Sequence, residues 1–251
     1  GGELSGTVDE LIRHSVSKLS HIHFVSNEEA AKRLLQMGEV ASSVFTIGSP
    51  DIDIMFSNTL PCLEVAKEYY QIDFEKFAIV MFHPVTTEAN EMEQYTDNFV
   101  NCLLDDHHNY VVVYPNNDLG SKYIISTYKR FENNNRFRVI PSLRFEYFLS
   151  LLKNAQFVIG NSSAGIREAP YYGLPIINIG TRQQNRAVHA DIINVDYSVE
   201  SISSALKTID EHQTVAVNPD FGSGNSNALF LEVIEKESFW TINHQKQFRG
   251  I

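Results

Sequence analysis

The sequence predicts an α/β fold whose parallel sheet is covered by helices on both faces. Apolar runs of strand length alternate with amphipathic stretches of helix length along most of the chain. The apolar runs are continuous, which is typical of strands that are buried on both faces of a parallel sheet. Right-handed connections would bring the carboxyl ends of these strands to one edge, where α/β proteins bind ligands.

Most of the predicted elements follow residue 48, beginning with the run FAIVMFHP. The expected strands are 77–84, 110–115, 137–142, 157–161, 176–180 and 192–195. The expected helices are 90–105, 120–133, 144–153, 164–172, 198–211 and 228–238, and 220–228 is expected to be a loop.

Residues 1–48 contain about two units of the same pattern. They are expected to form a helix at 8–19, a strand at 21–25, a helix at 27–37 and a strand at 44–48, and Thr7 with Glu10 has the spacing of a capping box. Two strands do not make a stable sheet alone. We therefore expect residues 1–48 to be the end of a preceding α/β domain whose start is absent from this chain, and residues 49–251 to be a second domain.

Composition and charge narrow the possible partners. The 251 residues are 43% hydrophobic and 20% charged, as in globular proteins, and the net charge of -11 argues against nucleic acid and anionic membranes as partners. We find no apolar run of about 18 residues and no signal peptide. Cys62 and Cys102 show neither metal spacing nor a disulfide framework, which favours a cytoplasmic protein.

The stretch GNSSAGIREAPYYGLPIINIGTRQ, residues 160–183, reads as the turn, helix and second strand of a βαβ unit. Ser162 and Ser163 could cap the helix and donate to a phosphate, because a helix amino end favours anions. Glu168 could accept hydrogen bonds from ribose hydroxyls, and Arg182, at the next strand end, could bind a phosphate with two donors. The alternative is ordinary capping by Ser163 and a surface Arg–Glu pair.

Two further strand ends carry candidate ligand-binding residues. His83 ends the first strand of the second domain and suits a leaving phosphate or a proton in transit, or it hydrogen-bonds the turn. At the following strand end, Asn116, Asn117 and Ser121 could bind a ligand or cap a helix.

The remaining candidates are an aspartate and the other histidines. Asp9 either serves as an acid or base beside the glycine-rich start of the chain, or pairs with Arg13 on one helix face as Glu10 does with His14. His21 and His23 are expected to be structural, because too few further metal ligands lie nearby. The pair His107-His108 is expected to lie in a solvated loop.

Taken together, these stretches resemble the hydrolysing UDP-N-acetylglucosamine 2-epimerases of sialic acid biosynthesis. The matching stretches are GGELSGTVDELIRHSVSKL, IGSPDID, FHPVTTE, YPNNDLGSK, VIGNSSAGIREA, GLPIINIGTRQ and GSGNSNA. The non-hydrolysing relatives are the weaker match, since they carry His-Arg-Arg-Glu-Asn where this chain has His83-Pro-Val-Thr-Thr.

The resemblance implies a GT-B fold, with a UDP-sugar between two Rossmann-like domains and most of the first domain absent here. Ser162, Ser163 and Arg182 match the family's phosphate-binding residues, and Glu168 matches its ribose ligand. His83 matches a histidine beside the diphosphate, and Asp9 matches a catalytic carboxylate. A catalytic Glu of the family precedes the position of Gly1, so the chain as numbered lacks it.

The implied reaction turns UDP-GlcNAc and water into N-acetylmannosamine and UDP through 2-acetamidoglucal, without metal or other cofactor, in a homodimer. A diacetyl-bacillosamine analogue is an equally allowed substrate. The alternatives are a GT-B glycosyltransferase and an inactive nucleotide-sugar-binding fragment.

Overall fold

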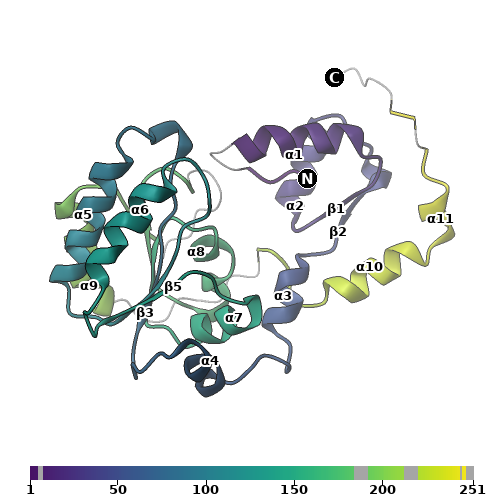
Figure 1. Ribbon diagram of the computed structural model, residues 1–251. Helices are drawn as coiled ribbons and strands as arrows, with labels where there is room; N and C mark the ends of the chain where they lie inside the picture. The colour runs from purple at the N-terminus through teal and green to yellow at the C-terminus, as the bar shows by residue number, and fades with distance from the viewer. Residues whose placement is uncertain (5–7, 184–191, 212–219, 244, 247–251) are drawn as a thin grey trace. The chain divides into compact units, whose positions relative to one another are not determined.

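The computed structural model describes residues 1–4, 8–183, 192–211, 220–243 and 245–246. The chain divides into two compact units (Figure 1). One comprises Gly1–Thr59 with Pro219–Ile251, and the other comprises Leu60–Asn218. Among the described residues, none of the helices is both long and apolar enough to cross a membrane.

The unit Leu60–Asn218 is built on a parallel sheet, and the described part of the unit contributes six strands to it. The strands are β3 (Ala78–Met81), β4 (Tyr110–Val113), β5 (Phe137–Ile140), β6 (Val158–Gly160), β7 (Ile176–Ile179) and β8 (Ile192–Val195). Their spatial order is β5-β4-β3-β6-β7-β8, and every neighbouring pair is parallel. The α/β class and the parallel sheet predicted from the apolar runs are confirmed.

Helices cover both faces of this sheet (Figure 1). The helices of the unit are α4 (Leu63–Tyr70), α5 (Met92–Asp105), α6 (Ser121–Tyr128), α7 (Phe145–Lys153), α8 (Ala164–Arg167) and α9 (Val199–Thr208). Helix α5 packs against α6 and α9, while α4 packs against α7. The inner strands β4, β6 and β7 are buried along their whole length, whereas the edge strands β5 and β8 are partly accessible. This difference explains why continuous apolar runs marked the centre of the sheet.

The strand order creates one position where the connections diverge. Strand β3 is the first strand of the unit and β6 the fourth, yet they are neighbours, and the chain leaves them toward opposite edges of the sheet. Doubly wound sheets bind ligands at the carboxyl ends of such a strand pair. The residues that follow Met81 and Gly160 therefore form the expected ligand site of this unit.

The other unit contains a two-stranded parallel sheet with helices from both ends of the chain. Its elements are α1 (Val8–Leu19), β1 (His23–Val25), α2 (Glu28–Gln36), β2 (Val44–Thr46), α3 (Pro50–Met55), α10 (Ser226–Ile234) and α11 (Glu237–Trp240). Asn27 caps α2, its Oδ1 accepting from the Ala30 amide at 2.8 Å. The predicted helix 8–19 is confirmed, but His21 precedes the strand that was expected to contain it.

The domain boundary predicted after residue 48 differs from the observed division, because α3 and the carboxyl-terminal segment belong to the first unit. Helix α3 packs against α10. The Asp53 carboxylate of α3 accepts from the amides of Ser226 and Asn227 and from the Ser226 hydroxyl, each at 2.9 Å. Asp53 thus caps a helix that begins 173 residues later, inside the predicted loop 220–228.

Several predicted helices are shorter or divided. The stretch 120–133 forms α6 followed by a 3-10 turn at Lys129–Phe131. The stretch 164–172 forms only the four residues of α8 and then a 3-10 turn at Ala169–Tyr172. Pro170 has no amide hydrogen to donate, so it interrupts the α-helical hydrogen-bond pattern there. The stretch 228–238 likewise divides into α10 and α11.

Candidate functional site

The carboxyl ends of β3 and β6 are joined through Asn161. Gly160 has φ of 140°, and a side-chain carbon there would lie 2.1 Å from the Met81 carbonyl oxygen, so only glycine allows this close approach. The buried Asn161 side chain then binds the backbone of His83 twice. Its Oδ1 accepts from the His83 amide at 2.7 Å, and its Nδ2 donates to the His83 carbonyl at 2.8 Å. The Asn161 side chain thus joins the two strands beyond Met81 and Gly160, the last residues that pair in the sheet.

The His83 ring is held as a neutral donor. Its Nδ1 accepts from the Asn116 amide at 3.1 Å, which leaves the proton of the neutral ring on Nε2. Burial and, second, the nearby Arg182 charge lower the pKa of His83 from 6.5 to about 4, with Asp118 opposing them. At neutral pH, His83 therefore offers an uncharged Nε2–H group for a ligand and is not a reservoir of a transferable proton.

Arg182 and Gln183 lie beside the same strand end. Both donate to the Asn161 carbonyl oxygen, Arg182 from Nη1 at 3.2 Å and Gln183 from Nε2 at 2.8 Å. Asn161 therefore binds the backbone of His83 through its side chain and Arg182 through its carbonyl. The structure thus brings the predicted residues His83 and Arg182 together around Asn161.

Glu88 connects the turn after His83 to the loop that carries Arg182. Its carboxylate accepts from the Thr181 hydroxyl at 2.5 Å and from the Tyr197 hydroxyl at 2.8 Å. The Tyr197 ring stacks on Tyr95, with ring centroids 3.8 Å apart. Gly180 has φ of 72°, and a side-chain carbon at Gly180 would lie 2.1 Å from the Tyr197 ring. Packing and hydrogen bonding thus fix the path of the chain directly before Arg182.

The two predicted serines follow β6 in the next turn. The buried Ser162 hydroxyl accepts from the Ala164 amide at 3.3 Å. Ser163 stands at the N-cap of α8, but its side chain makes no capping hydrogen bond within the described residues, so the alternative in which Ser163 only caps the helix is wrong. Because α8 has four residues, its dipole contributes little, and anion binding here depends on side chains and turn amides.

Glu168 and Asn116 are the remaining residues predicted to bind the nucleotide. Glu168 directly follows α8 at its C-cap. The Asn116 Nδ2 donates to Asp118, while its buried Oδ1 has no hydrogen-bond partner in the part of the chain that the structure describes. An unsatisfied buried acceptor next to His83 suits a ligand that brings its own donor.

The sequence and the fold of this chain are similar to those of known proteins. Residues 1–235 match the family described as UDP-N-acetylglucosamine 2-epimerase. The chain belongs to this family. The UDP-N-acetylglucosamine 2-epimerase of Neisseria meningitidis serogroup B is 49% identical over 251 residues, which cover 99% of this chain and 66% of that protein. A Legionella pneumophila relative described as hydrolysing UDP-N,N'-diacetylbacillosamine 2-epimerase is 31% identical, covering 94% of this chain and 63% of its own length. This chain thus spans slightly less than two thirds of these relatives.

A solved structure shares the fold of this epimerase-family chain. It is the Methanocaldococcus jannaschii UDP-GlcNAc 2-epimerase in complex with UDP-GlcNAc and UDP, with a TM-score of 0.74 and 18% identity. The match covers 93% of this chain and 67% of that one.

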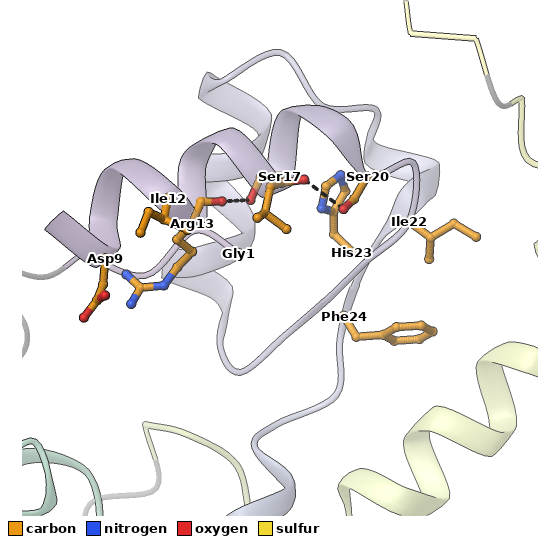
Figure 2. Close-up of a pocket in the computed structure, with 10 residues that line it drawn as sticks. Gly1, Asp9, Ile12, Arg13, Ser17, Ser20, Ile22, His23 and Phe24 are labelled. Atoms are coloured by element: carbon orange, nitrogen blue, oxygen red, sulfur yellow. Dashed lines mark hydrogen bonds between the residues drawn. The ribbon is translucent and has the colours of Figure 1, made fainter.

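In the epimerase-family chain, Asp9 belongs to the other compact unit and is exposed. It lines a cavity of about 360 Å³ between α1, β1 and the start of the chain, and it lies beside Arg13 on α1 (Figure 2). Arg13 Nη1 donates to the Glu3 carbonyl at 2.8 Å, and the Glu3 carboxylate accepts from Ser26 at 2.8 Å. Thr7 of the predicted capping box lies outside the described residues, whereas the predicted Glu10–His14 pair is confirmed at 3.4 Å.

Sequence reasoning missed Asn161, Gln183 and Glu88. Asn161 and Gln183 lie inside the stretch 160–183, and Glu88 ends FHPVTTE, but the sequence predicts no role for any of the three. Their residue types gave no signal, because what they do depends on hydrogen bonds to residues far along the chain. The separations are 78 residues for Asn161, 22 for Gln183 and 93 for Glu88.

Two predictions about the remaining histidines had opposite outcomes. The structural role of His23 is confirmed, since its Nε2 lies 3.0 Å from the Glu39 carboxylate with both side chains buried. The prediction of a solvated loop at His107-His108 is wrong for His108. That ring is buried between the Asp106 and Asp210 carboxylates, while His107 is exposed.

Proposed function

We propose that this chain carries the UDP-binding part of a hydrolysing UDP-N-acetylglucosamine 2-epimerase, which converts UDP-GlcNAc and water to N-acetylmannosamine and UDP. The observation that carries the proposal is the cluster of His83, Asn161 and Arg182. It lies at the carboxyl ends of β3 and β6, where the chain leaves two neighbouring strands toward opposite edges of the sheet. The family match and the descriptions of the relatives support it.

The cluster suits a nucleoside diphosphate. Arg182 supplies a delocalised charge with donors that match phosphate geometry, and His83 supplies one directional neutral donor. The two groups share Asn161 as a support, so their donors are held at a constant spacing. In this proposal Ser162 and Ser163 bind phosphate oxygens, Asn116 accepts from the nucleotide, and Glu168 accepts from the ribose hydroxyls.

The chemistry proposed for these groups is stabilisation of the leaving diphosphate. The C1–O bond breaks with its electron pair going to UDP, and a carboxylate removes the C2 proton, which yields 2-acetamidoglucal. Water then adds its oxygen to C1 while a proton returns to the opposite face of C2. His83 and Arg182 stabilise the charge on the departing UDP, an effect typically worth about 3–4 kcal/mol for one preorganised donor. We assign Asp9 a proton-transfer role in these steps.

The proposal extends to the whole protein. We infer that the unit Gly1–Thr59 with Pro219–Ile251 belongs to an amino-terminal Rossmann-like domain, that the two domains form a GT-B arrangement, and that the enzyme is a homodimer. A relative described as polysialic acid biosynthesis protein P7 of Escherichia coli, 32% identical over 235 residues, supports a role in sialic acid or related nonulosonic acid synthesis.

Calorimetry with UDP and uridine tests the binding proposal. Replacing Arg182→Ala should weaken UDP by about 1.5–3 kcal/mol, the scale of a lost charged hydrogen bond, and leave uridine nearly unaffected. Arg130→Ala is the matched control, because Arg130 is an exposed arginine of the same unit that contacts Asp97 and Asn101. No measurable UDP binding by the folded chain, or equal losses for both ligands, would contradict the proposal.

Product analysis separates the enzyme from a binding fragment. NMR of the sugars formed from UDP-GlcNAc should show N-acetylmannosamine with the full-length protein. UDP binding without any product in the full-length protein would favour a binding module, and transfer to an acceptor sugar would favour a glycosyltransferase.

A further inference from the structure

A second cluster of chemically active side chains lies at the amino ends of the strands, whereas His83 follows the carboxyl end of β3. Helix α5 ends at Asp105 and β4 begins at Tyr110, so the connecting loop lies at the amino ends of the strands. This loop carries Asp106, His107 and His108. Asp210, from the 3-10 turn Ile209–Glu211 after α9, approaches the same loop.

Two imidazole rings and two carboxylates form a closed arrangement here. The rings of His107 and His108 face each other with centroids 4.1 Å apart. Their Nδ1 atoms lie 3.5 Å and 2.7 Å from the Asp106 carboxylate oxygens. Their Nε2 atoms lie 3.5 Å and 3.0 Å from the two Asp210 oxygens. Each ring therefore bridges the same two carboxylates.

We propose that Asp106, His107 and His108 bind a divalent transition-metal ion such as Zn²⁺ through the carboxylate and the two Nδ1 atoms. Imidazole nitrogen and carboxylate oxygen are common Zn²⁺ ligands at about 2.0–2.2 Å, which in a tetrahedral site places donor atoms about 3.3 Å apart. His107 Nδ1 lies 3.5 Å from Asp106 Oδ1 and His108 Nδ1 lies 2.7 Å from Asp106 Oδ2, and these two separations bracket this value. One possible ligand atom from each of the three residues lies within 4.8 Å of the other two.

The surroundings of the cluster match those of metal-binding histidines. Such histidines usually donate the other ring N–H to a carboxylate, which selects the tautomer and orients the ring. Asp210 occupies this position for both His107 and His108. The Asp106 carboxylate is oriented in turn by the Tyr110 hydroxyl at 2.6 Å and the His108 amide at 2.9 Å.

One side of the cluster is rigid and the other is accessible. Arg136 donates to the backbone carbonyls of Leu104, Asp106 and His108, which fixes the loop. The His107 side chain is 74% exposed, so its ring can adjust toward an ion. A neighbouring cavity of about 390 Å³, lined in part by Asp106 and His107, offers an entry path and room for a fourth ligand. Three protein ligands with one open position is a recurrent Zn²⁺ arrangement.

The competing explanation is that a proton occupies the cluster. A hydrogen bond to Asp106 raises the pKa of His108, so an imidazolium between two carboxylates would also satisfy these groups. Metal binding would displace that proton from Nδ1. The two explanations predict different effects of removing His107. This ring contributes little to the buried network of hydrogen bonds, but as a metal ligand it would be needed for metal uptake.

Calorimetric titration of the chelator-treated chain with Zn²⁺ alone distinguishes them. We expect one ion per chain, at least about 10-fold weaker binding in His107→Ala, and about 10- to 100-fold weaker binding in Asp210→Asn. The matched control is His21→Ala, which removes an exposed histidine of the other unit and should leave Zn²⁺ affinity unchanged. Excess Mg²⁺ should not compete, because it prefers oxygen ligands in octahedral geometry.

The proposal is overturned if the wild-type chain takes up no Zn²⁺ in stoichiometric amount. It is also overturned if His107→Ala and Asp210→Asn both bind as tightly as the wild type, which would indicate unspecific uptake. Both variants lie away from the proposed nucleotide site, and their unfolding curves check that the fold is retained.

Discussion

Acidification should destabilise the unit Leu60–Asn218 through His83. The neutral ring is preferred in the folded state because burial and the Arg182 charge oppose protonation, which lowers the pKa from 6.5 to about 4. Above about pH 7 the ring is neutral in both folded and unfolded chains and has no effect on the pH dependence. Between 6.5 and about 4 the unfolded chain binds a proton that the folded chain does not, so stability falls as the pH falls through this window.

The magnitude follows from the difference between the two pKa values. The pKa of His83 falls from 6.5 to about 4, which corresponds to a loss of about 3 kcal/mol of unfolding free energy once the pH has fallen through this window. Below about pH 4 the ring is protonated in both states and contributes no further change. For a domain stability of about 5–15 kcal/mol, this loss is large enough to resolve.

Native-state hydrogen exchange at β3 and β6 measures this effect within the unit, at pH values from about 7 to 4. The His83→Gln variant should lose less protection on acidification than the wild type, because glutamine does not titrate yet can still accept from the Asn116 amide. His21→Gln removes an exposed histidine of the other unit and should behave like the wild type. If wild type and His83→Gln lose protection in parallel on acidification, the assignment of a buried neutral His83 is wrong.

Three further substitutions test the remaining parts of the structure. Glu88→Ala should weaken UDP binding about 5- to 50-fold in calorimetry, because it releases the chain before Arg182. Glu88→Gln keeps an acceptor for the Thr181 hydroxyl and should recover part of the loss. Equal UDP affinity in the wild type and both variants would refute the positioning role. Asp53→Ala should cost about 0.5–2 kcal/mol of unfolding free energy, measured by urea denaturation, because α10 loses its cap, and an unchanged midpoint would contradict this. Asp9→Asn should lower kcat of the full-length enzyme about 10²–10⁴-fold with UDP affinity unchanged, and near-normal turnover would leave Asp9 as an early-helix residue.

The strands of the large sheet were predictable because burial on both faces leaves a strong signal. Each of its strands lies inside a predicted range, from β3 within 77–84 to β8 at 192–195. The strand order was not predictable in the same way, since it depends on which buried faces meet. Yet that order defines the site, because it brings the end of β3 beside the end of β6.

Helix ends and the division into units were less predictable, because they depend on single distant contacts. Pro170 gave a local signal for the end of α8 that the helical pattern around it concealed. The capping of α10 by Asp53 gave none, since the partners are 173 residues apart. The carboxyl-terminal segment was therefore assigned to the wrong compact unit.

The candidate site shows the same limit at the level of single residues. His83 and Arg182 were identified because their side chains suit phosphate chemistry at strand ends. Asn161 was not, because its function lies in binding the backbone of His83 rather than a ligand. Residues that hold other residues in position have no distinctive type, and only the fold reveals them.

The net charge of -11 explains why the candidate site depends on local hydrogen-bond donors. The field of the whole chain opposes an anionic ligand, so affinity must come from donors in direct contact with it. One neutral donor at His83 and one charged donor at Arg182 together supply about 2–4.5 kcal/mol at typical hydrogen-bond values. Micromolar binding requires about 8 kcal/mol, so under the proposed function roughly half or more of the affinity for UDP would come from the ribose, the base and the turn amides. Under the proposed function, such a site would orient the diphosphate while binding it only moderately, which suits an enzyme that must release UDP after each turnover.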